Sequence, residues 1–454
     1  MATPKNMSLS KEAQATTVAH VKAYQRRRSL LGKRLQQGVV VLPTALEKIR
    51  NADTHYGYRF DSHFYYLTGF REPEAVLVII AGKKPKTVLF CREKNLEREI
   101  WDGHRYGPDA APKAFGIDEA YSINTLDEQL PKLLQNQSAL YTPIGLDKAW
   151  DERIIGWLNR VRAMARSGIT APTEIRDVRD PVSAMRLIKD DTEITIMRRA
   201  ALISSEAHKR AMRAVGKCRF EYEVEAELLH EFKRNGSQAP AYGSIVAAGA
   251  NACVLHYVEN DGPIDKGDLM LIDAGCELDG YASDITRTFP VSGKFSGPQK
   301  DVYELVLAAQ FAAIKAVKSG APFIAYHDAA VKVLVQGMID LKLCKGSRDK
   351  VIETGDYRRF YMHRTGHWLG LDVHDAGGYM CDGKWIKLEP GMMLTVEPGM
   401  YIRPANNVPK AFWNIGVRIE DDVLVTKKGR EVLTESCPKT VADIEALMAN
   451  GGAG

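Results

Sequence analysis

The chain has 454 residues, enough for two domains, and the composition of an ordinary globular protein, with 45% hydrophobic, 26% charged and 8% aromatic residues. Its 62 basic and 57 acidic residues leave a modest net charge of +5. A local basic cluster, Arg26–Arg28, lies among apolar residues in a helix-like segment. We interpret it as the solvated face of a helix, with nucleic-acid binding as the alternative.

Seven cysteines are scattered along the chain, odd in number and never spaced as C-x-x-C. This usage argues against a disulfide framework and against a thiolate zinc site. The N-terminal residues lack the apolar core of a signal peptide, and no apolar run is long enough to span a bilayer. We therefore expect a cytoplasmic protein that contacts neither a membrane nor nucleic acid.

The first part of the chain alternates helix and strand patterns. Helical periodicity runs from about Leu9 to Gln36, and apolar runs at Gly38–Thr44, Ala75–Ala81 and Thr87–Cys91 predict buried strands. Alternating strands and helices are typical of an α/β domain. We place its end near residue 180, which divides the chain into residues 1–180 and 181–454.

The pattern changes after this boundary. The long amphipathic stretch Ala184–Val215 predicts a helix, and a second helix is predicted at Glu221–Asn235. The rest is mostly strand and turn, interrupted by helices near Gly297–Ser319 and Ala325–Leu341. This mixture predicts an α+β second half.

Two acids stand out in the apolar stretch Leu269–Pro290. The dipeptide Asp279-Gly280 favours a type I′ hairpin turn, which would place Asp273 opposite Thr286. Asp284 then shares a face with Asp273 as its diagonal neighbour. Two carboxylates on an apolar hairpin are costly to bury unless a cation neutralises them. We interpret the hairpin as half of a metal site, with two surface acids as the alternative.

Three later stretches carry histidines or acids on apolar strands or beside glycine turns. They are Met362–Asp375, Met393–Ile402 and Gly416–Val425, and their candidate ligands are His367, Glu397 and Glu420. Strand alternation places Arg418 on the same face as Glu420. Taken singly, each also fits a core histidine, a turn acid or a solvated hairpin tip. Together with the hairpin they form a set of one imidazole and four carboxylates, which suits a pair of divalent metal ions.

The order Asp, Asp eleven residues later, His, Glu and Glu resembles the pita-bread-fold metallopeptidases, and within them the Xaa-Pro aminopeptidase (aminopeptidase P) family. The resemblance spans nearly the whole length. It implies an N-terminal creatinase-like α/β domain, residues 1–180, and a C-terminal pita-bread catalytic domain, residues 181–454. The stretches that carry it are Tyr65–Phe70, Glu72–Ala75, Leu255–Tyr257, Ile272–Cys276, Asp284–Pro290, His367–Asp375, Val396–Gly399 and Arg418–Asp422.

The resemblance implies two divalent metal ions, with Mn²⁺ expected and Zn²⁺, Co²⁺ or Fe²⁺ as alternatives. It assigns Asp273 to one metal, His367 and Glu397 to the other, and Asp284 and Glu420 to bridging positions. Bridging carboxylates hold two cations about 3.5–4 Å apart and let them share a hydroxide that is acidic enough to exist at neutral pH. That hydroxide would attack the scissile carbonyl, and Glu397 would receive its proton.

Further roles follow from the same resemblance. His256 and His374 correspond to histidines that line the substrate site, with His374 stabilising the developing oxyanion. His363 corresponds to a further pocket histidine. Arg418 and Tyr401 correspond to residues that hold metal ligands in place.

Three residues of the N-terminal domain also match the family. Asp53 corresponds to an acid that reaches toward the active site, and Trp101 and Arg166 to residues near a neighbouring subunit's cleft. This implies a homo-oligomer, a dimer or a tetramer. The alternatives are a turn acid, a core tryptophan and a surface arginine.

The implied activity is hydrolysis of the bond between an N-terminal residue and a penultimate proline in peptides. Because proline lacks an N–H and fixes φ, a dedicated pocket is needed, which His256, His363 and Tyr401 could form. One alternative is a prolidase restricted to Xaa-Pro dipeptides. The other is a non-catalytic pita-bread module that binds peptides, histones or RNA without metal, although all five ligand positions are filled here.

Overall fold

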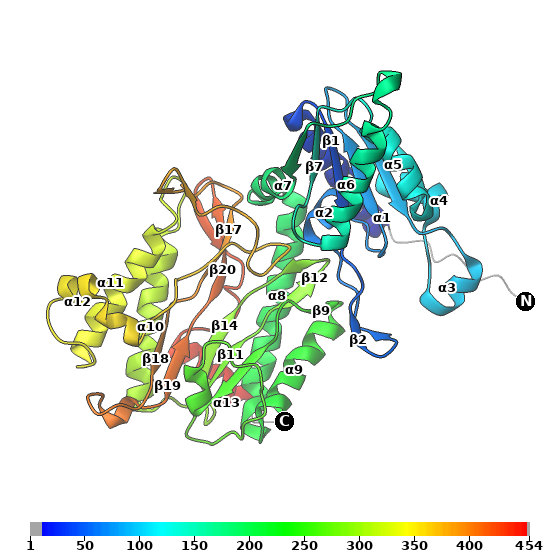
Figure 1. Ribbon diagram of the computed structural model, residues 1–454. Coiled ribbons are helices and arrows are strands. Elements are labelled where there is room, and N and C mark those ends of the chain that lie inside the picture. Colours follow the sequence, from blue (N-terminus) through cyan, green and yellow to red (C-terminus); the bar gives the residue numbers. More distant parts are fainter. Residues whose placement is uncertain (1–10, 452–454) are drawn as a thin grey trace, which may run out of the picture. The chain divides into compact units, whose positions relative to one another are not determined.

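The computed structural model describes residues 11–451 and divides into two compact units, Met1–Met185 and Arg186–Gly454 (Figure 1). The predicted boundary at residue 180 falls inside helix α7 (Arg179–Arg186). The first two residues of the predicted N-terminal helix, Leu9 and Ser10, lie outside the described residues. Within residues 11–451 no helix is both long and apolar enough to cross a membrane.

The N-terminal unit is built on a six-stranded mixed sheet in the order β6-β5-β4-β1-β7-β8. Its strands are β1 (Val39–Pro43), β4 (Val76–Ile80), β5 (Lys86–Cys91), β6 (Glu119–Ser122), β7 (Ala139–Thr142) and β8 (Glu174–Asp177), with a small hairpin of β2 (Ile49–Asn51) and β3 (Thr54–His55). Its remaining helices are α1 (Lys11–Leu35), α2 (Ser62–Thr68), α3 (Leu96–Asp102), α4 (Gly107–Phe115), α5 (Leu126–Leu134) and α6 (Lys148–Arg162). The three strands predicted in this half are present as β1, β4 and β5.

Strand alternation builds the core of this unit. Alternate residues of the central strands share one face of the sheet, where apolar area is removed from water. They are Val39, Val41, Val76, Val78, Val88, Phe90 and Leu140. This face packs against α5 and α6 through Leu130 and Trp157.

The C-terminal unit places two helix pairs beside its strands. Helices α8 (Asp191–Ala214) and α9 (Glu221–Arg234) lie side by side, as do α10 (Gly297–Ala316) and α11 (Ala325–Asp340) (Figure 1). Two more helices, α12 (Arg348–Thr354) and α13 (Val441–Gly451), complete the set within residues 186–451.

The prediction of one helix from Ala184 to Val215 is wrong at its start. Helix α8 begins only at Asp191 because Asp190 and Glu193 form a capping box there. The Asp190 side chain accepts from the backbone N–H of Glu193, and the Glu193 side chain accepts from that of Asp190. The residues between α7 and α8 are therefore a turn.

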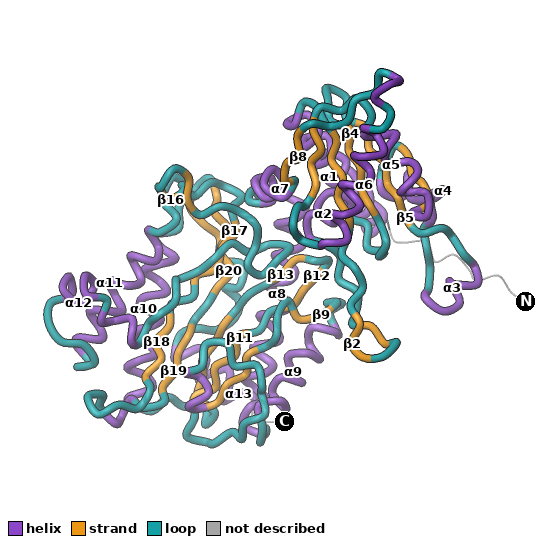
Figure 2. The backbone as a smooth tube through the Cα atoms, in the orientation of Figure 1, coloured by secondary structure: helices purple, strands orange, loops and turns teal. Residues whose placement is uncertain are grey.

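The strands of this unit are short and repeatedly interrupted, as the alternation of strand and loop in Figure 2 shows. They are β9 (Ala239–Pro240), β10 (Ile245–Ala248), β11 (Leu269–Asp273), β12 (Cys276–Leu278), β13 (Tyr281–Ala282), β14 (Thr286–Pro290), β15 (Met380–Cys381), β16 (Lys384–Trp385), β17 (Met393–Val396), β18 (Gly399–Ile402), β19 (Ile415–Arg418), β20 (Asp421–Thr426) and β21 (Gly429–Val432).

Candidate ligands stand at these interruptions. Asp273 ends β11, Asp284 lies between β13 and β14, Glu397 between β17 and β18, and Glu420 between β19 and β20. At a break in a strand, side chains no longer alternate between the two faces of the sheet. Acids from neighbouring strands can therefore point toward the same place.

The predicted hairpin register is confirmed. Asp273 pairs with Thr286, and β12 and β13 join through Leu278 and Tyr281 in the same register. The two residues of the turn have φ values of +49° at Asp279 and +82° at Gly280, as a type I′ turn requires. β11 and β12 belong to different sheets, but the residue pairing on both sides of the break between them follows the same register.

Candidate metal centre

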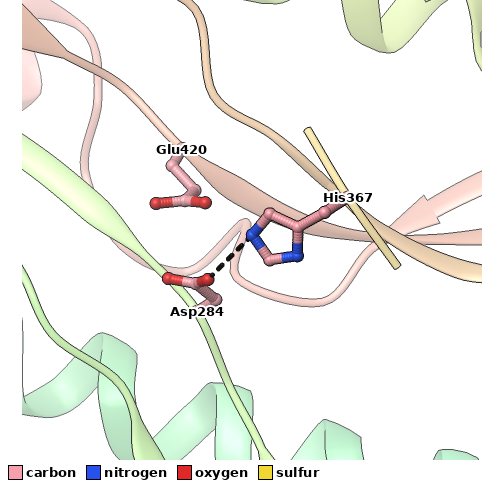
Figure 3. Close-up of side chains that lie close together, drawn as sticks. All are labelled: Asp284, His367 and Glu420. Carbon is pink, nitrogen blue, oxygen red and sulfur yellow. Dashed lines mark ion pairs between the residues drawn. The ribbon is translucent and has the colours of Figure 1, made fainter. Parts of the chain in front are cut away.

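Three of the predicted ligands form a compact cluster. One ligand atom from each of Asp284, His367 and Glu420 lies within 4.8 Å of the others (Figure 3). The Nε2 atom of His367 is 3.3 Å from Oδ2 of Asp284 and 3.5 Å from Oε1 of Glu397. Asp284 and Glu420 are 5% and 2% exposed, so the acids are withdrawn from water.

The ring of His367 is oriented by the backbone. Its Nδ1 donates to the carbonyl of Trp368 at 2.9 Å, and a carbonyl can only accept. This bond leaves Nε2, the atom that faces the acids, available as a metal ligand. The backbone N–H of His367 also donates to the hydroxyl of Thr395, whose Oγ1 donates to Glu397.

Asp273 adjoins the cluster through two hydrogen-bond donors. Arg418 Nη2 donates to its Oδ2 at 2.6 Å. The hydroxyl of Tyr242 lies between the two hairpin acids, 2.6 Å from Oδ1 of Asp273 and 2.5 Å from Oδ1 of Asp284. Sequence reasoning missed Tyr242, which stands in a loop without a motif, and its contact explains how the two carboxylates are held side by side.

Arg418 connects the remaining members of the site. Its Nη1 donates to the hydroxyl of Tyr401 at 2.9 Å and its Nε donates to Thr286 Oγ1 at 3.2 Å. Thr286 in turn donates to Oε2 of Glu420 at 2.6 Å. Arg418 and Glu420 thus meet on one side, as strand alternation predicted, and the contacts of Arg418 and Tyr401 fit the predicted role of holding ligands in place.

The electrostatics of the cluster are those of crowded acids. Burial raises the pKa of Glu397 to about 7. Burial and the charges of Asp284, Glu397 and Asp273 raise the pKa of Glu420 well above its usual range. Burial alone would lower the pKa of His367, but the hydrogen bond to Asp284 and the charge of Glu397 raise it to about 9.

This donor set fits a pair of divalent cations. Four carboxylates supply hard oxygen ligands, and the imidazole of His367, whose Nε2 faces Asp284 and Glu397, supplies one nitrogen ligand. Arg418 pairs with Asp273, and His367 lies beside Asp284 and Glu397, so the four buried acids share two cationic side chains. Repulsion between the acids nevertheless remains and contributes to the raised pKa of Glu420. A divalent ion among them would relieve this repulsion.

A cavity of about 420 Å³ opens beside the cluster. Of the predicted substrate residues, His256, His363 and His374 line it. His363 Nε2 lies 2.9 Å from the Tyr401 hydroxyl, and the ring of His374 stands 4.4 Å from that of His367. The cavity wall also contains residues to which the sequence assigned no role, namely Leu255, Arg364, Gly366 and Tyr379.

The three site residues predicted in the N-terminal unit are all exposed there. Asp53 lies in the turn of the β2–β3 hairpin, and Arg166 in a short 3₁₀ turn. Trp101 on α3 is 83% exposed, so the alternative of a core tryptophan is wrong. The roles of all three residues stay predictions.

Comparison with known families identifies the class. Residues 195–427 match metallopeptidase family M24, and residues 24–141 match the N-terminal domain of aminopeptidase P. The chain therefore belongs to metallopeptidase family M24 and is a peptidase that depends on divalent metal ions. The predicted architecture, an N-terminal α/β domain followed by a pita-bread domain, is confirmed.

Individual relatives narrow the class further. The chain is 45% identical to the Xaa-Pro aminopeptidase of Haemophilus influenzae over 93% of this chain and 96% of that protein. It is 44% identical to the Xaa-Pro aminopeptidase of Escherichia coli over 94% and 97%. Its structure resembles the aminopeptidase PepP of Pseudomonas aeruginosa, with a TM-score of 0.93 and 49% identity over 96% and 99% of the two chains. A zinc-substituted E. coli aminopeptidase P in complex with product gives a TM-score of 0.92 and 44% identity over 95% and 98%.

Proposed function

We propose that this protein is an Xaa-Pro aminopeptidase that releases the N-terminal residue from peptides whose second residue is proline. The convergence of Asp284, His367 and Glu420 beside a histidine-lined cavity carries the proposal. The relatives named Xaa-Pro aminopeptidase, which match over almost the whole chain, support this specificity.

Five residues would hold the metal ions, which we propose to be Mn²⁺. Asp273 would bind one ion, His367 and Glu397 the other, and Asp284 and Glu420 would bridge them. When bound, a pair of divalent ions supplies an acidified water as nucleophile and polarises the carbonyl that it attacks. The hydrogen bonds from Tyr242, Arg418 and Thr286 would keep the carboxylate oxygens oriented during this reaction.

Different residues of the chain would accept the proton and stabilise the negative charge that develops on the substrate. Glu397 would accept a proton at its carboxylate, the role that the family resemblance implies. His374, in the cavity wall beside His367, would donate to the oxygen on which negative charge develops. Burial and the charge of Arg418 lower the pKa of His363, so its imidazole is neutral at pH 7 and can line a pocket for an uncharged ring.

Proline at the second position defines the specificity. Its tertiary amide donates no hydrogen bond and its ring fixes φ, so the pocket must enclose a ring rather than pair with a backbone N–H. His256 and His363, which line the cavity, and Tyr401, whose hydroxyl contacts His363, would form this pocket. We further propose a cytoplasmic homo-oligomer in which Asp53, Trp101 and Arg166 contribute to substrate binding.

The test compares Xaa-Pro-Yaa tripeptides with Xaa-Pro dipeptides after loading the protein with Mn²⁺ or Zn²⁺. Release of Xaa from the tripeptide is expected, with Mn²⁺ the better activator. Hydrolysis of the dipeptide alone would make the protein a prolidase. Glu397→Gln should abolish hydrolysis, whereas the exposed Glu389→Gln in the same segment should not. A parent that binds no divalent ion and hydrolyses neither peptide would support a non-catalytic binding module.

A further inference from the structure

A buried carboxylate outside the metal centre organises the loop that carries His256. Glu221, the first residue of α9, is 0% exposed and forms no ion pair with a described lysine or arginine. A charge buried in this way is stable only when hydrogen bonds replace its water. In Glu221 both carboxylate oxygens have such bonds.

Four donors converge on Glu221, all from residues 248–262. The backbone N–H of Ala248 donates to Oε1 at 2.7 Å and the side-chain amide of Asn251 donates to Oε1 at 3.0 Å. The hydroxyl of Tyr257 and the backbone N–H of Gly262 each donate to Oε2 at 2.7 Å. Because Ala248 and Gly262 are the two ends of the loop, one side chain fixes both ends and the middle.

Leu255 packs against the hydrophobic core, but the neighbouring His256 has no comparable anchor of its own. Leu255 and His256 line the cavity, and the exposed imidazole of His256 forms no hydrogen bond with the described residues. Its place is therefore set by the backbone on either side. On one side Arg403 donates to the carbonyl of Cys253 at 2.8 Å, and on the other the adjacent Tyr257 is held by Glu221.

Gly262 shows how tightly the loop closes on Glu221. A Cβ atom at Gly262 would lie 2.8 Å from Oε2 of Glu221 and 2.8 Å from Nδ2 of Asn251. The backbone N–H of Glu221 also donates to the Gly262 carbonyl at 3.0 Å. Glycine is needed here for close approach, since its φ is not positive.

We propose that Glu221 is a positioning residue for substrate binding, which acts by holding the loop 248–262 and with it His256 in the cavity wall. The proposal rests on the proposed peptidase function. Two sets of residues would then support the site. Tyr242 and Arg418 orient the metal ligands, and Glu221 orients the part of the cavity wall that contains His256.

The test is Glu221→Gln in the full chain, with Glu223→Gln as the matched control. Glu223 lies in the same helical turn, and its side chain accepts hydrogen bonds from Arg219. Glutamine keeps the shape of Glu221, but its NH₂ group cannot accept the hydrogen bonds that the replaced carboxylate oxygen accepted. We expect kcat/KM for an Xaa-Pro-Yaa tripeptide to fall about 10-fold to 100-fold, mostly through KM, as for a misplaced binding group. Calorimetric affinity for Mn²⁺ should be unchanged, and Glu223→Gln should match the parent in both measurements.

Two further measurements separate positioning from general damage. Hydrogen exchange should accelerate at the amides of Ala248 and Gly262 in Glu221→Gln while exchange in β11 stays slow. In a double-mutant cycle, Glu221→Gln should cost little once His256→Ala is present, since both changes remove the same contact. Gly262→Ala retains the Glu221 carboxylate but displaces it, and should reproduce the rise in KM if Glu221→Gln fails to fold.

Several results would overturn the proposal. These are a Glu221→Gln protein with parental KM and parental exchange, full additivity with His256→Ala, or a loss of Mn²⁺ affinity equal to the loss of activity. A parent that hydrolyses no Xaa-Pro peptide would refute the proposed function instead. The exchange measurement would then still report whether Glu221 holds the loop.

Discussion

Gly275 faces the carbonyl of Ser283 so closely that a Cβ atom at Gly275 would lie 1.7 Å from that oxygen. The contact lies at the break between β11 and β12, one residue from Asp284 and two residues from Asp273. No side chain can enter this space without opening the hairpin. The two acids can therefore stand side by side because the residue between them has no side chain.

Gly275→Ala should consequently weaken the metal centre. The hairpin must separate locally to admit the methyl group, which costs about 1–3 kcal/mol of unfolding free energy, as in other overpacked sites. Mn²⁺ affinity, measured by calorimetry, should fall as the two acids move apart. Gly267→Ala, in the loop before β11 where a Cβ would meet nothing within 4 Å, is the control. Parental affinity in Gly275→Ala would contradict this account.

Tyr242→Phe tests the hydroxyl shared by Asp273 and Asp284. Loss of this donor leaves one oxygen of each carboxylate free to rotate, so Mn²⁺ affinity should fall about 10-fold to 100-fold, as for other residues that orient metal ligands. The fold should persist, because phenylalanine keeps the ring. The control is Tyr222→Phe, whose side chain is 49% exposed and stacks on Phe220. An unchanged metal titration would show that the hydroxyl does not orient the ligands.

Metal removal should destabilise the C-terminal unit. Ions that bind only the folded state stabilise it by about 2.7 kcal/mol when their free concentration is 100 times Kd. The midpoint of thermal unfolding should therefore rise with added Mn²⁺ and fall again with a chelator. In Glu420→Gln this shift should be much smaller, since a proposed bridging carboxylate is lost. A shift of parental size in that variant would exclude Glu420 as a ligand.

Stability should depend on pH through Asp375. Burial by itself would raise the pKa of Asp375, but Lys189 and Arg186, which bind it at 2.9 and 2.5 Å, hold the pKa below its usual value. A depressed pKa contributes stability that is present above the unfolded pKa of about 3.9 and lost as pH falls through the folded pKa.

Asp375→Asn should remove this contribution, leaving the buried Lys189 without its carboxylate partner and Arg186 with Asp372 alone. At neutral pH the unfolding free energy should fall by about 3–5 kcal/mol, as when a buried ion pair is broken. The difference from the parent, followed by denaturant titration, should shrink as pH falls below about 4, where Asp375 of the parent becomes protonated first in the unfolded and then in the folded state. Asp349→Asn, whose side chain is 92% exposed, should show neither effect. A difference that stays constant with pH would refute the ion-pair explanation.

Local chemistry made the hairpin predictable. Asp279-Gly280 can adopt two successive positive φ values, so the turn fixes the register, and the register fixes which residue lies opposite Asp273. The start of α8 also has a local signal, because Asp190 and Glu193 have the spacing of a capping box. The amphipathic pattern, which continues on both sides of these residues, concealed that signal. The ligand roles came from the family resemblance rather than from this pattern.

Residues that support the site could not be predicted in the same way. Tyr242 is 31 residues from Asp273 and 42 from Asp284, and Glu221 is 41 residues from Gly262. A tyrosine in a loop or a glutamate at the start of a helix has no periodicity that indicates its partner. Such contacts depend on how distant strands and loops meet in the folded chain.

The spacing of the ligands has a consequence for how the protein is made. The proposed ligands run from Asp273 to Glu420, so a chain still growing on the ribosome cannot complete the metal centre until most of the C-terminal unit has emerged. The sheet of the N-terminal unit, by contrast, closes with strands that end at Asp177. Since domains generally fold as units during synthesis, this unit can be in place before the last ligand is translated. Truncation before Glu420 would then yield a folded N-terminal unit without a complete metal centre.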